Sequence, residues 1–149
     1  MARDLVTSLV FARNAFGIGR LSYYLLKLLG VEFPRPVPVG RDLEIVHGGF
    51  GIVIHRWAKI GNRVKIYPGV TLGRADIHLP ISESAFRGIE IRDDVILSGG
   101  CKVLGKEGIL VVGKGTIVGA NAVLLHSTGE NEIWAGVPAR KIGMREPPV

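Results

Sequence analysis

The chain has 149 residues, of which 47% are apolar and 7% aromatic, and this composition suits one domain with a core of Ile, Val and Leu. Glycine is spread along the chain, which excludes a low-complexity protein, and no apolar run reaches the roughly 18 residues of a membrane span. The net charge of +6 suggests an anionic partner, such as a phosphorylated cofactor or an acidic membrane surface. Nucleic acid is not expected, because basic and aromatic residues are not interleaved.

Cys101 is the only cysteine, so the chain can form neither an internal disulfide nor a cysteine-rich metal site. This favours a protein of the reducing cytoplasm. The start of the chain also lacks the apolar core of a signal peptide.

Residues 1–30 have the three-to-four spacing of amphipathic helices. This spacing predicts two helices, each with one apolar face, separated at Gly17 and Gly19. The first face contains Leu5, Leu9, Ala12 and Phe16, and the second contains Leu21, Tyr24, Leu25 and Leu28. We expect a cap that packs on the main body or on a neighbouring subunit, and peripheral membrane contact is the alternative. FPRPVPVG then forms a stiff connector, so residues 1–38 precede a main domain of residues 39–149.

From residue 39 onward the apolar residues repeat every six positions. The large members are Ile54, Ile60, Ile66, Leu72, Ile91, Leu97, Val103, Val112, Val118 and Leu124. A second set of small or branched residues follows, each four positions after a large member: Ala58, Val64, Val70, Val95, Cys101, Thr116 and Ala122. Neither a helix nor a hairpin sheet has this period. The pattern predicts a parallel β-helix in which three hexads complete a triangular coil and both sets point inward.

The six-residue repeat is interrupted twice. Between Leu72 and Ile91, polar and turn residues occupy about the length of one coil, and we expect a loop of about residues 73–88 extruded at a corner. Such loops often form a binding face. Between Val103 and Val112 a few additional residues predict a corner bulge.

The segments IGNRVKIYPGVTLG, ILSGGCKVLG, IVGANAVLL and AGVPARKIG resemble the hexapeptide-repeat acyltransferases, in particular serine acetyltransferases and their short relatives that O-acetylate sugars of bacterial surface polysaccharides. The resemblance covers roughly residues 39–143. It implies a mainly β fold, a left-handed β-helix, acetyl-CoA as donor, and a homotrimer with active sites between subunits. The first forty residues are too short for the helical domain of serine acetyltransferases, which favours the polysaccharide relatives.

Acetyl transfer to a hydroxyl needs a base for the hydroxyl proton, and histidine suits that task. His47, in EIVHGGFGIVI, matches the general base of the resembled family, with Asp42 and Glu44 as candidates to orient it. His78, in the loop, is the rival base. His55 is equally compatible with a place in the same cleft and with a structural role.

The resemblance also suggests binding residues. Gly99 and Ala120 match positions that line the acetyl-CoA groove, and Arg140 and Lys141 lie in a tail expected near the cofactor phosphates. In the loop region, Asp76 and Arg87 are the candidate acceptor-binding residues. Serine acetyltransferases have Arg-His-Pro where this chain reads Arg87-Gly88-Ile89, and the missing histidine puts serine in doubt as the acceptor.

Two further residues are expected to carry no chemistry. Cys101 occupies a small-residue position and is expected to be buried, so transfer proceeds directly without an acyl-enzyme. His126 is expected to be a solvated turn residue. No metal site is evident.

The sequence therefore favours a cytoplasmic acetyl-CoA-dependent O-acetyltransferase acting on a sugar hydroxyl. A serine O-acetyltransferase is the first alternative. The second alternative is a non-catalytic β-helix scaffold, similar to the γ-carbonic-anhydrase-like proteins, whose active members need three convergent histidines.

Overall fold

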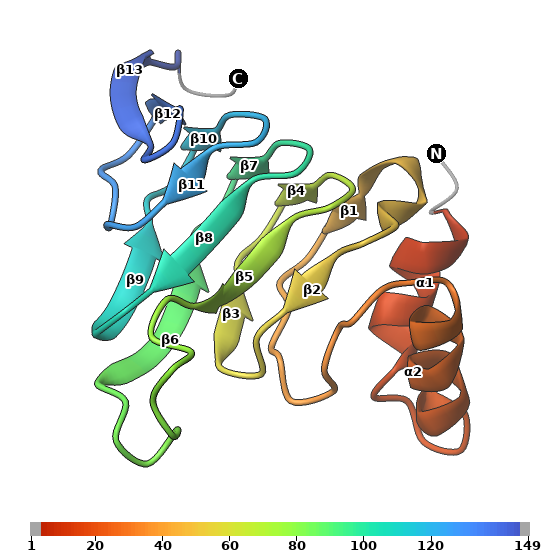
Figure 1. The fold of residues 1–149 in the computed structure, drawn as a ribbon. Coiled ribbons are helices and arrows are strands. Elements are labelled where there is room, and N and C mark those ends of the chain that lie inside the picture. The colour runs from red at the N-terminus through yellow and green to blue at the C-terminus, as the bar shows by residue number, and fades with distance from the viewer. Residues whose placement is uncertain (1–3, 147–149) are drawn as a thin grey trace.

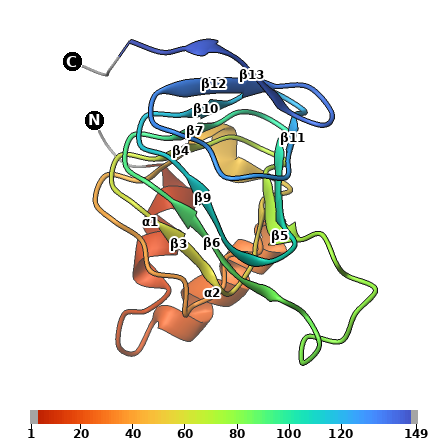
Figure 2. The ribbon, with the colours of Figure 1, turned by 90° about the vertical axis from the view of Figure 1, so that its left-hand side faces the viewer.

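The computed structural model describes residues 4–146, which form a left-handed parallel β-helix preceded by two helices, as the hexapeptide pattern predicts. Three sheets make the faces of a triangular prism (Figures 1 and 2). The first face contains β1 (Glu44–Ile45), β4 (Lys65–Ile66), β7 (Ile96–Leu97), β10 (Ile117–Val118), β12 (Glu132–Ala135) and β13 (Arg140–Met144). The second contains β2 (Val53–Ile54), β5 (Thr71–Arg74), β8 (Lys102–Gly105) and β11 (Val123–Leu124). The third contains β3 (Ala58–Ile60), β6 (Phe86–Ile91) and β9 (Gly108–Val112). The pairing is parallel throughout, except between β12 and β13.

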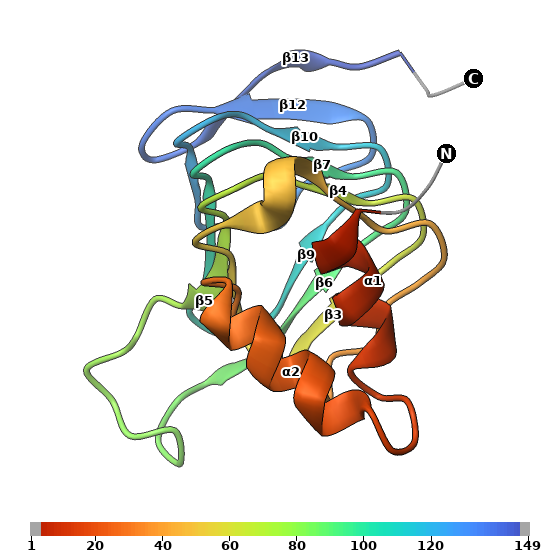
Figure 3. The same ribbon diagram turned by 90° about the vertical axis from the view of Figure 1, so that its right-hand side faces the viewer.

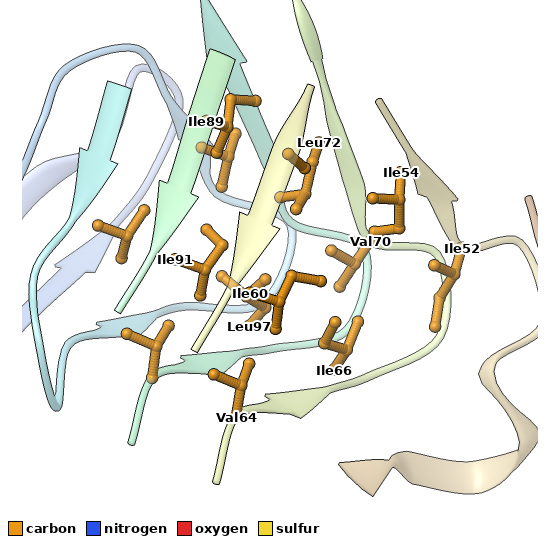
Figure 4. Close-up of a cluster of buried hydrophobic side chains, with 14 of the residues drawn as sticks. Ile52, Ile54, Ile60, Val64, Ile66, Val70, Leu72, Ile89, Ile91 and Leu97 are labelled. Atoms are coloured by element: carbon orange, nitrogen blue, oxygen red, sulfur yellow. The ribbon is translucent and has the colours of Figure 1, made fainter. Parts of the chain in front are cut away.

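The interior of the prism is filled by the residues that the six-residue period selects. Both predicted sets are buried, Thr116 and Cys101 included. Parallel pairing places Ile54 beside Leu72 and Ile60 beside Ile91, so each large side chain stacks on its equivalent in the next coil (Figure 4). Burial of one such side chain contributes about 1.5–3 kcal/mol, and this repeated gain holds each coil in register with its neighbours.

The two interruptions differ from their predicted forms. The loop spans residues 75–85, because β5 continues to Arg74 and β6 begins at Phe86. The predicted corner bulge between Val103 and Val112 is wrong. The additional residues instead lengthen β8 and β9, which pair with β5 and β6, since the extended strands at the base of the loop need hydrogen-bonding partners.

The parallel ladder also begins before residue 39. Isolated bridges join Glu32 to Val53 and Val39 to Ile60, so the proline-rich connector forms part of the first coil. Proline has no backbone N–H to donate, which suits an irregular first coil at the end of a sheet.

Helices α1 (Leu5–Ala12) and α2 (Gly19–Leu28) cover the N-terminal end of the prism (Figure 3). Val6, Val10 and Leu26 are the buried apolar residues of this pair. The predicted packing face of the second helix, which contains Leu21, Tyr24, Leu25 and Leu28, is exposed in the single chain. This face does not pack on the main body, because both helices are apolar on more than one side and spacing alone cannot select the buried one. Its packing on a neighbouring subunit stays a prediction. None of the helices described in residues 4–146 is long and apolar enough to cross a membrane.

A buried arginine joins the helices to the connector. The Arg13 guanidinium donates to the carbonyl oxygens of Val10 and Val37 and, at 3.3 Å, to that of Pro34, and it lies 4.8 Å from the Phe33 ring centre. Burial lowers the pKa of Arg13 to about 10, which keeps it charged at neutral pH. The guanidinium therefore serves as a three-way link between backbone segments.

Arg13→Met is expected to lower the free energy of unfolding by about 3 kcal/mol, because the buried carbonyl groups of Val10 and Val37 lose the charged donor that Arg13 supplies. Urea unfolding measures this loss. Arg56→Met is the control, since Arg56 is exposed. Equal midpoints for the two variants would contradict the linking role.

Candidate functional site

The predicted site residues lie at two different corners of the prism. The first corner joins the first and second faces, and it contains His47, Gly99 and Ala120. The second corner joins the second and third faces and contains His55 and the loop that carries Asp76 and His78. Figure 2 shows that loop projecting away from the prism. Within one chain the two groups of candidates are thus separated by the width of a face.

His47 lies in a strained turn at the first corner. The short 3₁₀ segment η1 (Val46–Gly49) places His47 in the left-handed backbone region, at φ 52° and ψ 37°, followed by Gly48 and Gly49, which also have positive φ. Non-glycine residues with this backbone are uncommon and concentrate at functional sites. The turn leaves the His47 side chain exposed at the corner.

The His47 ring contacts an aromatic side chain. It lies edge-on to Tyr67 of the next coil, with 6.0 Å between ring centres. Glu44 forms an ion pair with Lys65 at 2.9 Å, and neither Glu44 nor Asp42 hydrogen-bonds His47 in the part of the chain that is described. A carboxylate that orients this imidazole is therefore not found among residues 4–146 of a single chain.

The first corner above His47 is narrow and lined by small residues. Gly51, Gly69, Gly100 and Asn121 all have positive φ and stack along it. A Cβ on Gly69 would lie 3.4 Å from the Gly100 Cα, so successive coils approach closely here. Ala120 is exposed, and the space beside Gly99 is open apart from the Pro68 carbonyl oxygen. The corner thus exposes backbone along its length, which fits an extended, thin ligand.

The tail after the last coil reaches the same corner. Ala139 N donates to the Val123 carbonyl oxygen at 2.8 Å, which brings Arg140 to this edge. Arg140 is exposed, and within residues 4–146 its side chain donates only to the adjacent Ala139 carbonyl oxygen, whereas Lys141 pairs with Glu132 at 2.9 Å. The Lys141 ammonium, followed by the Trp134 indole N–H, lowers the pKa of Glu132. Of the two predicted phosphate ligands, Arg140 is the one that forms no ion pair with a carboxylate in the described part of the chain.

His55 at the second corner is held by aromatic rings. Its Nδ1 accepts a hydrogen bond from the Trp57 backbone N–H at 3.1 Å, and its ring lies edge-on to Trp57 and Phe86. Burial lowers the pKa of His55, and the positive charges of Arg74 and Arg56 lower it further. A neutral imidazole whose Nδ1 accepts carries its proton on Nε2, so His55 is arranged as a hydrogen-bond donor.

The loop is closed by a buried clasp made of Asp76 and Ser84. Ser84 Oγ donates to Asp76 Oδ2 at 2.6 Å and accepts from the Phe86 N–H at 3.0 Å, while Arg74 Nη1 lies 3.3 Å from Asp76 Oδ1. The Ser84 hydrogen bond lowers the pKa of Asp76, and the charge of Arg74 lowers it further. Asp76 is thus committed to holding the loop, and its predicted contact with an acceptor stays a prediction. His78 is exposed on the same loop.

Ser84→Ala is expected to speed backbone hydrogen exchange of residues 77–83 by roughly 10-fold, because the bond to a charged carboxylate is lost. Because the pKa of Asp76 is lowered, the clasp stabilises the loop at neutral pH and weakens only as the pH falls below 3.8. Ser82→Ala is the control, since Ser82 is exposed on the same loop. Equal exchange in both variants would contradict the clasp.

Arg87 and Gly88 begin the return from the loop. Arg87 Nη1 donates to the carbonyl oxygens of Ser84 and Phe86 at 2.7 and 2.8 Å, so the side chain folds back over the base of the loop. Gly88 has φ 146°, and a Cβ there would lie 2.7 Å from the Trp57 carbonyl oxygen. The position where serine acetyltransferases are expected to carry histidine therefore has no room for a side chain in this chain.

The solvent exposure of Cys101 and His126 agrees with the expectation for each residue. Cys101 is fully buried, and burial raises the pKa of its thiol to about 12, so it provides no thiolate nucleophile at neutral pH, as expected. His126 is exposed, also as expected. Within residues 4–146, no three His, Cys, Asp or Glu side chains gather as a metal site requires.

Sequence reasoning missed four residues that shape these corners: Tyr67, Trp57, Phe86 and Ser84. Tyr67 had a usable signal, because it falls at the first corner one coil after His47. Ser84 had none, since its pairing with Asp76 depends on the path of an irregular loop.

Sequence comparison relates this chain to serine acetyltransferases. No protein-family model matches the chain. It is 34% identical over 134 residues to the serine acetyltransferase of Bacillus licheniformis and 34% identical over 131 residues to that of Bacillus subtilis. These alignments cover 89% and 83% of this chain but 58% and 56% of the two relatives. The chain thus spans little more than half the length of the curated relatives it matches.

Solved structures agree with the sequence matches. The crystal structure of a serine acetyltransferase from Brucella abortus superposes with a TM-score of 0.77 at 26% identity, covering 96% of this chain and 57% of that chain. A serine acetyltransferase in complex with CoA superposes with a TM-score of 0.68 at 30% identity, covering 92% and 54%. The serine acetyltransferase branch of the expected resemblance is confirmed, and the polysaccharide branch stays a prediction. This chain is a hexapeptide-repeat β-helix similar in sequence and fold to serine acetyltransferases.

Proposed function

We propose that the protein is an acetyl-CoA-dependent O-acetyltransferase in which His47 is the general base. This proposal rests on the turn at His47, where the side chain is exposed and the backbone is in the left-handed region. The turn belongs to a chain that is similar to a serine acetyltransferase over 134 residues. His47 accepts the proton of the acceptor hydroxyl while the hydroxyl oxygen attacks the acetyl carbonyl carbon. The carbon–sulfur bond then breaks, the acetyl group passes to the oxygen, and CoA leaves as a thiolate.

The first corner fits the donor. Gly99 and Ala120 leave the backbone accessible to the thin pantetheine arm, and Arg140, which pairs with no carboxylate among residues 4–146, offers its charge to the phosphates. Lys141 contributes less to this charge, because Glu132 already pairs with it. These residues bind and orient the thioester beside His47.

The separation of the two corners supports an assembly in which one subunit completes the site of another. His47 and the donor groove lie at one corner, whereas His55, His78 and Arg87 lie at the other. The loop tip exposes Ile77 and Ile81, and exposed apolar side chains on a clasped loop favour docking against protein. We infer a homotrimer, in which the loop of one subunit walls the His47 corner of the next.

Serine is the first acceptor to test, because the similar proteins are serine acetyltransferases. A sugar hydroxyl is the second candidate, and Gly88 favours it. With no side chain possible at that position, one expected ligand of the serine carboxylate is missing. The cytoplasmic location remains a prediction from the single cysteine.

The decisive experiment measures acetyl-CoA binding by calorimetry and then free thiol release with serine and with a panel of sugars. Release with serine supports the first acceptor, and release with a sugar alone supports the second. Absence of acetyl-CoA binding would reject the enzyme and leave the scaffold alternative.

A further inference from the structure

Helix α2 has an apolar face that the β-helix does not cover. Ser22 and Leu26 point into the protein, and the opposite side of the helix carries Leu21, Tyr24, Leu25 and Leu28. Leu21, Tyr24 and Leu28 are 61%, 65% and 82% exposed. Figure 3 shows α2 on the outside of the N-terminal end of the prism. A helix needs only one apolar face to pack on its own protein, so this second face, here called the cap face, calls for a different partner.

The segment before α2 extends the cap face. Phe16 and Ile18 are exposed in the turn between the two helices. Beside them lies a surface hollow of about 450 Å³, lined by Asn14, Ala15, Phe16, Gly17, Gly19, Arg20 and Arg35. Asn14 Nδ2 donates to the Arg35 carbonyl oxygen at 3.0 Å, which fixes this part of the connector against the turn. Two arginines and an aromatic ring thus border one depression.

The charges around the cap face are positive and available. Arg20 and Arg35 are exposed, and no carboxylate pairs with either side chain among residues 4–146. Lys27 is the one basic residue of α2 that pairs with an acid, namely Glu32 at 3.0 Å. An apolar stripe bordered by unpaired guanidinium groups is complementary to a surface with an apolar layer beneath an outer layer of anionic groups.

We propose that the cap face docks the protein on an anionic phospholipid surface. Leu21, Tyr24, Leu25 and Leu28 enter the boundary between headgroups and acyl chains, where their burial is favourable. Arg20 and Arg35 bind lipid phosphates at the adjacent hollow. The β-helix then stands on the membrane by its N-terminal end, and both candidate site corners remain open to the aqueous side. This proposal does not depend on the acetyltransferase activity.

The test is flotation of the full chain with vesicles of phosphatidylcholine alone and of phosphatidylcholine with 30% phosphatidylglycerol. Tighter binding to the anionic vesicles, weakened by added salt, is the expected result. Arg20→Gln with Arg35→Gln is expected to lower the affinity for anionic vesicles by about 30-fold, because each basic residue near the surface contributes a factor of about five. Lys106→Gln with Lys114→Gln removes the same charge from exposed positions outside the cap face and is the matched control.

The apolar contribution has its own pair of variants. Tyr24→Asp with Leu28→Asp is expected to abolish vesicle binding, whereas Ile109→Asp with Ile142→Asp alters exposed apolar residues elsewhere and leaves it intact. Because all four positions are exposed, thermal unfolding is expected to stay close to that of the parent chain. Failure of the parent chain to bind anionic vesicles would overturn the proposal. An equal loss of vesicle binding in Ile109→Asp with Ile142→Asp would also overturn it. So would Tyr24→Asp with Leu28→Asp if this variant changed the oligomer mass but still bound vesicles.

Discussion

His47→Asn lowers turnover by about 100-fold or more while the protein stays folded, if His47 removes the proton from the acceptor hydroxyl. Asparagine is preferred over alanine because it tolerates the left-handed backbone that His47 adopts at φ 52°. The change therefore removes the base without removing the turn. Steady-state thiol release with acetyl-CoA and the active acceptor measures the effect, and calorimetry checks that donor binding is retained.

The matched variants separate His47 from the other histidines. His126→Asn alters an exposed histidine away from the His47 corner and is expected to leave turnover unchanged. His78→Asn tests the rival base in the loop. Near-normal turnover of His47→Asn together with a large loss in His78→Asn would move the base to the loop.

Gly88→Ala is expected to lower the free energy of unfolding by about 2–4 kcal/mol. The added methyl group meets the Trp57 carbonyl oxygen at 2.7 Å, and φ 146° is unfavourable for any residue with a Cβ. The strain falls where β6 shifts its register against β9, at the return from the loop. The midpoint of urea unfolding is the measurement.

Gly108→Ala provides the control for Gly88→Ala. Gly108 also has positive φ, 56°, but no atom lies within 4 Å of the position of its Cβ. Its replacement is expected to cost about 1 kcal/mol from the backbone alone. A loss in Gly88→Ala no larger than this would show that the Trp57 carbonyl yields, and the position could then accept a histidine.

The candidate site was only partly predictable from the sequence. The family resemblance assigned roles to His47, Gly99, Ala120 and Arg140 by their places in the matching segments, and these roles stay predictions. Asp76 was expected to meet an acceptor, yet the structure engages it with Ser84 and Arg74. Such pairings join residues of an irregular segment, and no periodicity relates one to the other.

By itself, the sequence determined the β-helix. A six-residue period admits one way of burying Ile54, Ile60, Ile66 and their equivalents, because each coil must bring the same positions inward and stack them on the coil before. Tertiary structure alone decided which face of α2 is exposed, how the strands at the base of the loop pair, and that His47 and His55 lie at different corners. Those outcomes depend on competition between several apolar faces and on hydrogen bonds between distant segments. The spacing of residues along the sequence depends on neither of these factors, so these three features can be determined only from the folded structure.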